Sequence, residues 1–568
     1  MNGAELVIDF LIRKGVKKAF GYPGGPVIIL YEAIYKYEFP HVLTRHEQGA
    51  VHAAEGYAKV SGQPGVCLAT SGPGATNLVT GLADAYLDSV PVLAITGAVA
   101  RESIGTDAFQ EADITGVTQP ITKYNYLVMD PEELLPILEE AWTLTTEGRP
   151  GPVLVNIPKD ILSMTIELSQ IKSSSYARHR PPKIKTQALS DKVYAALARS
   201  RRPLLLAGGG CVISEGGTDD LLRFVDGLGI PVATTLMGKG AIPEDHPLFL
   251  GILGMHGTPQ ANTALGNCDL LLAVGSRFSD RIIGDFKSYN PDGKRQIIHV
   301  DIDPAEIGKN VKADLGIEDD AAGFFEAMLA VRPEIDYSAD WSAWKQELDR
   351  KKQEYQAVKN AMYEPSRPLT PQFVVHQVAN ALKGQNPVVV TDVGQHQQFV
   401  AQHYPVESPR SFITSGGLGT MGFGLPAAIG ASAAAPDRTT LLFAGDGGFQ
   451  MTIQELGVLA KLRLPLKIFI MDNCCLGMVR QWQELFFDRH YSQTILDNNP
   501  DFVMIAEAYG LPAGTACDGE SLKEQINHAL AAEGPYIVHC LINPDENVFP
   551  MIPAGKMPQD LIMPGMGD

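Results

Sequence analysis

Short runs of consecutive apolar residues recur along the chain, and each run ends in a turn rich in glycine or serine. Examples are residues 66–70, 203–207, 270–274 and 440–444. Runs that are apolar throughout predict strands buried on both faces of a parallel sheet. Stretches long enough to form helices separate them, as connections between parallel strands require. The pattern therefore predicts an α/β fold built from doubly wound parallel sheets.

The apolar runs fall into three blocks, since 568 residues are too many for a single hydrophobic core. Further strands are expected at 92–96, 296–301, 387–391 and 466–471. A polar, basic stretch and a charged helical stretch separate the blocks, and both are interpreted as linkers. The predicted organisation is a first domain at 1–165, a linker at 166–188, a second domain at 189–335, a linker at 336–368, a third domain at 369–548, and a tail or lid at 549–568.

Charge and cysteine content exclude several classes of protein. The formal net charge of -19 argues against nonspecific binding of nucleic acid. The seven cysteines are scattered without a C-x-x-C pair, which argues against a disulfide framework or a zinc site and favours a reducing compartment. The first 15 residues lack the apolar core of a signal peptide, and no apolar run reaches the length of about 18 residues that suggests a membrane span. We expect a cytoplasmic, bacterial-type protein with neither a membrane nor a nucleic-acid partner.

The strand at 440–444 ends in Gly445-Asp446-Gly447-Gly448, and the next strand ends in Asp472-Asn473. Asn473 lies 27 positions after Asp446, a separation that accommodates one helix and one strand. Both side chains are then expected at the carboxyl edge of one sheet, where open α/β sheets bind ligands. Hard oxygen ligands suit Mg²⁺, and glycine N–H groups at a helix start favour a phosphate. The alternative is a tight turn with a solvated aspartate.

Glu47 follows a short predicted strand and precedes a helix of small residues expected at 50–58. A helix N-terminus stabilises a carboxylate. The residues alone therefore leave Glu47 open as a capping residue or as a functional acid.

Two further segments of the third block are candidates for ligand contact. Residues 416–424 contain five glycines that would let the backbone approach a ligand, with Leu418, Met421 and Phe423 between them. A flexible glycine-rich loop is the alternative. Gln395 and His396 follow another strand end, which is weak evidence on its own.

These segments resemble the cofactor-binding motifs of the thiamine-diphosphate-dependent enzymes related to pyruvate decarboxylase. The resemblance implies that Asp446, Asn473 and the carbonyl of Cys475 bind Mg²⁺. It implies that Glu47 activates the cofactor through N1′ of its aminopyrimidine, that Met421 holds the two rings in a V, and that Gly419 accepts a hydrogen bond from the 4′-amino group. Further cofactor contacts implied are Pro23, Gly24, Gly74, Asn77, Val393, Gly394, Gln395, His396, Gly447, Gly448, Gly477 and Met478.

Within this superfamily, the chain resembles the catalytic large subunits of the acetohydroxyacid (acetolactate) synthases over residues 3 to 560. The segments that carry the resemblance are 105–111, 253–258, 300–309 and 477–484. Such enzymes decarboxylate pyruvate and join the resulting hydroxyethyl carbanion to a second 2-keto acid. The products, 2-acetolactate or 2-aceto-2-hydroxybutyrate, lead to valine, leucine and isoleucine.

The resemblance also implies substrate contacts. Arg281 and Trp482 would hold the second keto acid, since a guanidinium pairs well with a carboxylate. Gln110, assigned a catalytic role, would line the same pocket with Phe109, Lys159 and Gly25. Taken without the resemblance, Trp482 reads as a packing residue and Arg281 as a surface ion-pair partner.

The middle block is expected to be a Rossmann-like domain that binds FAD, which this family carries without net redox change. The implied contacts are Gly208, Gly209, Gly210, Thr235, Leu236, Met255, His256, Gly275, Ser276, Arg277, Arg281, Asp301, Ile302 and Asp320. A run of three glycines is a weak signal by itself, and the other segments strengthen it.

Because Glu47 and Asp446 fall in different blocks, the resemblance implies a homodimer or homotetramer with sites between subunits, and a small regulatory subunit as a possible partner. The chain departs from the family at Ala98-Val99-Ala100, Pro26 and Ser279. The first two departures affect the expected substrate channel, and Ser279 affects the expected flavin site. The competing predictions are a pyruvate oxidase with the same cofactors and a noncatalytic scaffold, although a scaffold needs none of Glu47, Asp446 and Asn473.

Overall fold

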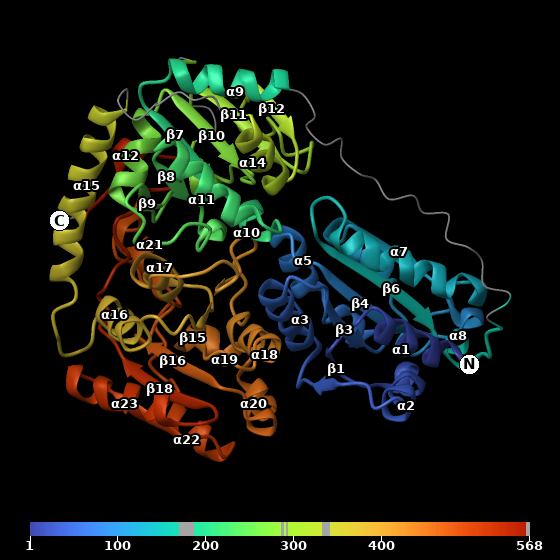
Figure 1. The fold of residues 1–568 in the computed structure, drawn as a ribbon. Helices are drawn as coiled ribbons and strands as arrows, with labels where there is room; N and C mark the ends of the chain where they lie inside the picture. The colour runs from blue at the N-terminus through green and yellow to red at the C-terminus, as the bar shows by residue number, and fades with distance from the viewer. Residues whose placement is uncertain (168, 170–186, 286–288, 291–292, 332–340, 564–568) are drawn as a thin grey trace.

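Each of the three predicted blocks contributes one six-stranded sheet in the computed structural model (Figure 1). The structure describes residues 1–167, 169, 187–285, 289–290, 293–331 and 341–563. Every pairing between the named strands is parallel. The predicted α/β class with doubly wound parallel sheets is therefore confirmed.

The first sheet has the order β2-β1-β3-β4-β6-β5. Helices cover both faces, so the central strands are buried along their whole length, as their uniformly apolar sequence predicts. The strands are β1 (Ala19–Gly21), β2 (His41–Leu43), β3 (Gly65–Ala69), β4 (Val92–Ala98), β5 (Tyr124–Leu127) and β6 (Pro152–Pro158). The helices are α1 (Gly3–Arg13), α2 (Ile28–Lys36), α3 (Glu47–Ser61), α4 (Pro73–Thr76), α5 (Val79–Asp88), α6 (Ile114–Thr118), α7 (Leu134–Thr146) and α8 (Lys159–Ser163).

The middle sheet has the order β12-β11-β10-β7-β8-β9, which is the arrangement of a Rossmann-like domain. Its strands are β7 (Pro203–Ala207), β8 (Val232–Thr234), β9 (Phe249–Ile252), β10 (Leu270–Val274), β11 (Gln296–Asp301) and β12 (Leu315–Glu318). The helices are α9 (Gln187–Arg199), α10 (Gly209–Ile213), α11 (Gly217–Leu228), α12 (Pro259–Asn267), α13 (Asp280–Ile283) and α14 (Ala321–Ala330).

The third sheet has the order β14-β13-β15-β16-β18-β17, which repeats the order of the first sheet position by position. Its strands are β13 (Val388–Thr391), β14 (Phe412–Ile413), β15 (Thr440–Gly445), β16 (Leu466–Asp472), β17 (Ala513–Ala516) and β18 (Tyr536–Leu541). The helices are α16 (Pro371–Ala381), α17 (Gln395–His403), α18 (Gly424–Ala434), α19 (Asp446–Met451), α20 (Leu456–Leu462), α21 (Gly477–Phe486), α22 (Phe502–Ala508) and α23 (Gly519–Ala531). The prediction that one α/β fold occurs twice around a central Rossmann-like domain is confirmed.

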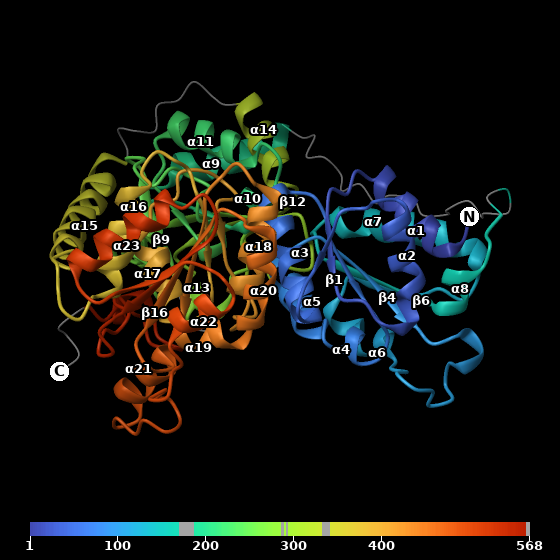
Figure 2. The same ribbon diagram turned by 90° about the horizontal axis from the view of Figure 1, so that it is seen from below.

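The first and third domains meet through α3 and α18, which lie side by side in both views (Figures 1 and 2). A Cβ added to Gly56 would collide with the backbone of Ala427, and one added to Gly430 would collide with the backbone of Ala53. Glycine is required at both positions because the two helix backbones approach so closely. A single hydrophobic cluster consequently continues from the first domain into the third.

One of the two predicted linkers contains a packed helix. The charged run after the middle domain forms α15 (Ser342–Ala361), which packs on α12 through the buried Trp344 and Leu348. It is a structural part of the middle domain, because its apolar stripe is buried there, and the interpretation as a simple linker was wrong for these residues. Most of the other predicted linker, residues 170–186, lies outside the described residues.

The segment predicted to be a loose tail or lid also packs against the protein in its described part. Met551 is fully buried, and the N–H of Ile552 donates to the carbonyl of Met255 at 2.8 Å. Residues 564–568 of this segment lie outside the described residues. Among the helices that the structure describes, none is both long enough and apolar enough to cross a membrane.

Candidate active site

Glu47 is the first residue of α3, and its side chain is only 9% exposed. The cap of this helix is His46, whose Nδ1 accepts a hydrogen bond from the N–H of Gln48 at 3.1 Å. Glu47 is therefore not the capping residue that the local sequence suggested as one alternative. Instead, its Oε2 accepts a hydrogen bond from Nδ2 of Asn77 at 2.9 Å. Glu47 and Asn77, predicted together from the resemblance, are in direct contact.

Glycines pack closely around this carboxylate at the ends of β1 and β3. A Cβ on Gly74 would lie 2.6 Å from Thr70 and 3.1 Å from Oε1 of Glu47, and a Cβ on Gly24 would lie 2.5 Å from Thr70. A Cβ on Gly72 would lie 2.7 Å from the carbonyl oxygen of Gln110. Pro23 lines an adjoining surface hollow of about 710 Å³. The predicted residues of the first domain thus gather at one sheet edge.

Gln110 also lines a cavity of about 270 Å³ with Ala98 and Val99. Two of the three residues at which the chain departs from the family at 98–100 therefore face the same space as Gln110. Gln110 itself has a positive φ of 61°, which side chains other than glycine adopt rarely.

In the third domain, Asp446 follows β15 and Asn473 follows the adjacent strand β16. Both are buried, at 1% and 9% exposure. Burial and the neighbouring carboxylate of Asp472 raise the pKa of Asp446 to about 7. Carboxylate and amide oxygens are ligands that Mg²⁺ accepts, so Asp446 and Asn473 could hold a divalent cation. Cys475 is buried beside them, and its N–H donates to Oδ1 of Asn473 at 3.3 Å.

Asn499 bridges the carboxylates of Asp446 and Asp472, and the sequence analysis did not predict it. Its Nδ2 donates to Oδ2 of Asp446 at 2.6 Å and to Oδ1 of Asp472 at 3.0 Å. Asp472 in turn lies 2.8 Å from Nε2 of His539. Asn499 is far from both strand ends in sequence and belongs to no motif, so only the tertiary structure reveals it.

Gln395 and His396 begin α17 beside the same strand ends. Oε1 of Gln395 accepts from Nδ2 of Asn473 at 3.3 Å, while its Nε2 donates to Oε1 of Gln481 at 2.9 Å. Burial lowers the pKa of His396 to about 4, and its Nε2 is buried without a hydrogen-bond partner among the described residues. A neutral imidazole with an unused nitrogen at a helix N-terminus suits an anionic group.

The remaining predicted residues of this domain lie at the ends of β13 and β15, at the start of α21 and in the segment before α18. A Cβ on Gly447 would lie 3.7 Å from Cε of Met421, and a Cβ on Gly448 would lie 2.6 Å from Asp392. The N–H of Val393 donates to Asp392 at 2.6 Å, and Gly394 precedes α17 with a φ of 151°. Gly477 begins α21, and a Cβ on it would lie 2.1 Å from Oε1 of Gln395. Met478 packs on the hydrophobic core of this domain. Gly419 has a φ of 74°. These contacts leave little room for side chains where the glycines lie.

Arg281 and Trp482 come together from different domains. The guanidinium carbon of Arg281 lies 5.9 Å from the centre of the Trp482 ring, and its Nη1 lies 3.1 Å from the sulfur of Met255. Nε1 of Trp482 is buried without a partner in the described part of the chain. The Arg281 side chain is more than half exposed and 4.0 Å from Asp280, so a weak surface ion pair coexists with the stacking.

The other predicted pocket residues lie elsewhere in the same chain. α8, which begins at Lys159, and α21, which holds Trp482, lie on opposite sides of the molecule in both views (Figures 1 and 2). The helical turn that begins at Gly25 contacts α8 and not α21. Phe109 is 89% exposed. One copy of the chain therefore does not bring all the predicted pocket residues together.

The predicted flavin contacts line the carboxyl ends of neighbouring strands of the middle sheet. Gly208 follows β7, Gly275 and Ser276 follow β10, and Asp301 ends β11. A Cβ on Gly208 would collide with the carbonyl of Gly275, so part of the glycine requirement arises within the protein. Ser276 has a buried hydroxyl without a partner among the described residues.

The other expected flavin contacts border the same edge or the Arg281 side chain. Oγ1 of Thr235 accepts from Gly238, and Asp320 accepts from Ser214 at 2.5 Å. Burial raises the pKa of Asp301 to about 6. Burial lowers the pKa of Arg277, and it lowers the pKa of His256 to about 4. The N–H of Met255 donates to the carbonyl of Arg281 at 2.7 Å. The remaining predicted flavin contacts directly follow Gly208, Thr235 or Asp301 in the sequence, and they are Gly209, Gly210, Leu236 and Ile302.

Three family models match the chain in sequence order. They are described as the N-terminal, central and C-terminal domains of thiamine pyrophosphate enzymes, and they match residues 1–117, 190–328 and 392–540. The first and last are described as binding thiamine pyrophosphate, and they coincide with the two domains that share a strand order.

Curated relatives match over nearly the full length. A probable acetolactate synthase large subunit of Methanocaldococcus jannaschii is 44% identical, covering 99% of this chain and 95% of that protein. The large subunit of acetolactate synthase isozyme 2 of Escherichia coli is also 44% identical, with 99% of both chains covered. The acetolactate synthase large subunit of Lactococcus lactis is 43% identical over 99% of this chain and 96% of its own. The chain therefore belongs to the acetolactate synthase large subunits, a family of thiamine pyrophosphate enzymes.

Proposed function

We propose that this chain catalyses the condensation of pyruvate with a second 2-keto acid, giving 2-acetolactate or 2-aceto-2-hydroxybutyrate for branched-chain amino acid synthesis. It is a thiamine-diphosphate-dependent acetolactate synthase, as its family and its relatives indicate. The assignment of the site rests on one observation, which is that Asp446 and Asn473 are both buried and lie at the ends of adjacent strands. A second thiamine pyrophosphate domain of the same strand order supplies the buried Glu47.

Bound thiamine diphosphate supplies a nucleophilic carbon and an acceptor for the electrons released on decarboxylation. The role of Glu47 is to share a proton with N1′ of the aminopyrimidine. Asn77 occupies Oε2 of Glu47 as a hydrogen-bond donor, which leaves Oε1 available for this proton. The close packing of Gly74 against the carboxylate keeps bulk water away from it. General acid–base assistance of this kind typically contributes about 10²–10⁴-fold to a rate.

Mg²⁺ would be held by the carboxylate of Asp446, the amide oxygen of Asn473 and the carbonyl of Cys475. The buried acidic environment of Asp446 and the fixing of the Asn473 amide by Gln395 support this assignment. The diphosphate would lie against the start of α17, where His396 offers an unpartnered ring nitrogen. Met421 next to Gly447 would support the rings of the cofactor.

We assign Arg281 to the carboxylate of the second keto acid and Trp482 to the wall that selects its side chain. The stacking of the guanidinium on the indole orients its N–H groups, and the partial exposure of Arg281 keeps them accessible. FAD would bind at the carboxyl edge of the middle sheet, which the unpartnered hydroxyl of Ser276 supports.

A homodimer or homotetramer would complete the pocket, with Gly25, Phe109 and Lys159 contributed by a second copy. The exposed Phe109, together with Phe486 and Phe487 on the projecting α21 segment, supports such a contact (Figure 2). The relatives named as large subunits also support a small regulatory subunit as a partner. The seven free cysteines support a reducing, cytoplasmic location.

The shared site is tested with a mixed dimer of one Glu47→Gln chain and one Asp446→Asn chain, isolated by two affinity tags. If each site takes Glu47 from one copy and Asp446 from the other, one site of the pair is intact and about half of the wild-type activity returns. Homodimers of either variant are the controls and stay inactive. A mixed dimer as inactive as the controls would show that both residues of a site come from one chain.

The reaction is tested by incubating the purified chain with pyruvate, thiamine diphosphate, Mg²⁺ and FAD. Acetolactate formed without oxygen uptake is the expected result. Acetate or acetyl phosphate formed with peroxide would instead support the pyruvate oxidase alternative. A chain that binds the cofactor but converts no pyruvate would support the scaffold alternative.

A further inference from the structure

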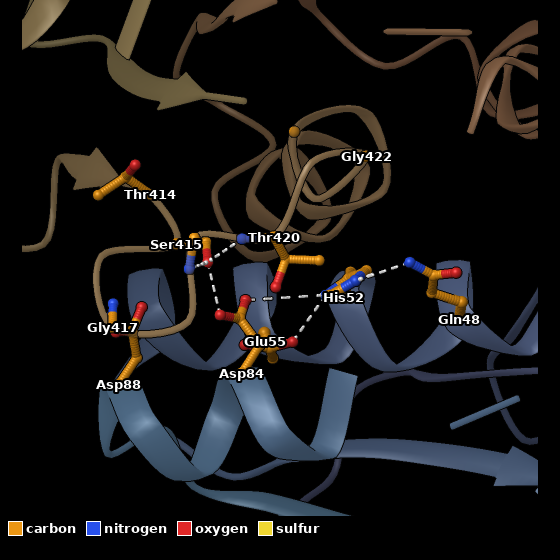
Figure 3. A network of polar contacts seen from close by, with 12 residues as sticks. Gln48, His52, Glu55, Asp84, Asp88, Thr414, Ser415, Gly417, Thr420 and Gly422 are labelled. Atoms are coloured by element: carbon orange, nitrogen blue, oxygen red, sulfur yellow. Dashed lines mark hydrogen bonds and ion pairs between the residues drawn. The ribbon is translucent and has the colours of Figure 1, made fainter. Parts of the chain in front are cut away.

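A buried polar cluster joins the first and third domains of the same chain at a distance from Glu47. It consists of His52, Glu55 and Lys59 on α3, Asp84 and Asp88 on α5, and the segment 414–420 of the third domain (Figure 3). The side chains of His52, Glu55, Asp84 and Asp88 are fully buried. None of these residues belongs to the cofactor motifs, although the segment they meet contains Gly419.

Asp88 binds the backbone at the start of this segment. Its Oδ1 accepts from the N–H of Gly417 at 2.7 Å, and its Oδ2 accepts from the N–H of Gly416 at 3.1 Å. Nζ of Lys59 donates to the same Oδ2 at 2.7 Å and to the carbonyl of Thr414 at 2.5 Å. Charge-assisted hydrogen bonds away from water fix three residues of the segment, Thr414, Gly416 and Gly417.

Asp84 acts on the next turn through Ser415. Oγ of Ser415 donates to Oδ1 of Asp84 at 2.5 Å. The same oxygen accepts from the N–H groups of Gly419 at 3.1 Å and Thr420 at 2.9 Å. Because the hydroxyl of Ser415 donates its hydrogen bond to Asp84, the oxygen lone pairs of Ser415 are directed at these two N–H groups. The orientation of the peptide groups around Gly419 thus depends on a carboxylate of the other domain.

His52 and Glu55 complete the surroundings of Asp84. Nδ1 of His52 lies 2.8 Å from Oε1 of Glu55 and 4.0 Å from Oδ2 of Asp84. Burial raises the pKa of both the Glu55 and the Asp84 carboxyl groups, because two adjacent negative charges are removed from water. The cluster is closely packed, which holds Asp84 in one position.

We infer that Asp84 and Asp88 are positioning residues that, with Ser415 as the relay, set the backbone of Gly416–Thr420 for binding of the cofactor. The inference rests on the proposed function, in which Gly419 meets the aminopyrimidine. The first domain then has two tasks. It supplies Glu47, and through the cluster it shapes the cofactor loop of the third domain to which it is covalently joined.

The test is Ser415→Ala in the full-length enzyme, with Ser432→Ala as the matched control. Ser432 is equally buried on α18, and its hydroxyl has no partner within the described residues. Thiamine diphosphate is titrated at saturating Mg²⁺, and binding is followed by the near-ultraviolet circular dichroism of the bound cofactor. Ser415→Ala leaves two N–H groups and a carboxylate unpaired, so we expect about 10-fold weaker binding and an altered dichroism band. The control binds within about a factor of two of the wild type.

Asp88→Asn is the second variant, and it should weaken cofactor binding by a similar factor. Ser415→Cys, whose thiol is a much weaker hydrogen-bond donor and acceptor than the hydroxyl, replaces Ser415→Ala if the latter does not fold. Variants with wild-type affinity and an unchanged dichroism band, whatever their thermal stability, would overturn the inference. Absence of acetolactate from the wild-type enzyme would count against the proposed function alone, because the binding titration is read without turnover.

Discussion

The first and third domains share a strand order and differ in the residues at the strand ends. After the third strand in chain order, the first domain has Thr70-Ser71-Gly72 and the third domain has Asp446-Gly447-Gly448. After the second strand, α3 begins with Glu47, whereas α18 begins with Gly424. On the proposed function, the same scaffold presents a proton-sharing acid at one position and metal ligands at another. The comparison shows that chemistry is assigned by single residues on a common fold.

The equivalent helices α3 and α18 also form the contact between the two domains. Small residues on both, Gly56 and Ala53 against Ala427 and Gly430, allow the backbones to touch. Early residues of α18 face late residues of α3, so the two helix starts point away from each other. Nine residues separate Glu47 from Gly56, which corresponds to about 13 Å along the helix. This geometry favours sites completed by a second copy.

Glu47→Gln tests the chemical half of the comparison and has the largest expected effect. The amide keeps the size of the side chain and cannot share its proton in the same way. We expect kcat to fall by about 10³-fold, with thiamine diphosphate binding changed by less than about a factor of three. Acetolactate formation and a cofactor titration measure the two quantities. Glu140→Gln on α7 is the control, and turnover by Glu47→Gln at the wild-type rate would refute the role of this residue.

Asp446→Asn tests the other half of the comparison, which is the metal-ligand role proposed for the third domain. Loss of one ligand charge should raise the Mg²⁺ concentration for half-maximal activity by at least about 10-fold and weaken cofactor binding in parallel. The measurement is activity as a function of Mg²⁺ at fixed thiamine diphosphate. Asp437→Asn, in the exposed turn before the same strand, should leave both constants unchanged. If the two variants behaved alike, Asp446 would not be a ligand.

Gly430→Ala tests the helix contact. The added methyl group would collide with the backbone of Ala53, and neither helix can move without disturbing a fully packed core. We expect the free energy of unfolding to fall by about 2 kcal/mol, measured by denaturant titration. Gly534→Ala is the control, since its nearest atom would be 3.7 Å away. A variant as stable as the wild type would mean that the two helices do not touch in this way.

Glu455→Gln gives the smallest expected effect and concerns pH. Glu455 accepts from the N–H of Arg45 at 3.0 Å, next to Glu47, and burial raises the pKa of Glu455 to about 7. A raised carboxyl pKa stabilises the fold at low pH, and this contribution is lost as pH rises through the folded-state value. Between pH 5 and 8 the wild type should lose about 1 kcal/mol that the variant does not lose. Melting temperatures across this range, with the exposed Glu533→Gln as control, measure the difference. Parallel pH curves would rule out this assignment.

Periodicity predicted the strands well wherever the apolar run was uniform. The strands at 203–207, 270–274 and 296–301 agree with β7, β10 and β11 at both ends. The strand expected at 92–96 extends to Ala98, because an apolar strand and its turn differ little in composition there. The run at 341–363 looked like a linker because most of its residues are charged or polar. Its buried residues Trp344 and Leu348 pack on the middle domain only because the fold places α12 beside them.

The candidate site likewise contains residues that local sequence predicts and residues that only the tertiary structure reveals. Local sequence was enough to place Asp446 and Asn473 at the ends of neighbouring strands, because strand ends are set by nearby residues. It left Glu47 open between a capping residue and a functional acid, and the role proposed for Glu47 comes from the resemblance. Local sequence was not enough for Asn499, which binds Asp446, or for Asp84 and Asp88, which bind the cofactor loop more than 300 positions away. These contacts depend on how whole domains pack. Packing is decided by the summed complementarity of many side chains, and no short window of sequence contains that information.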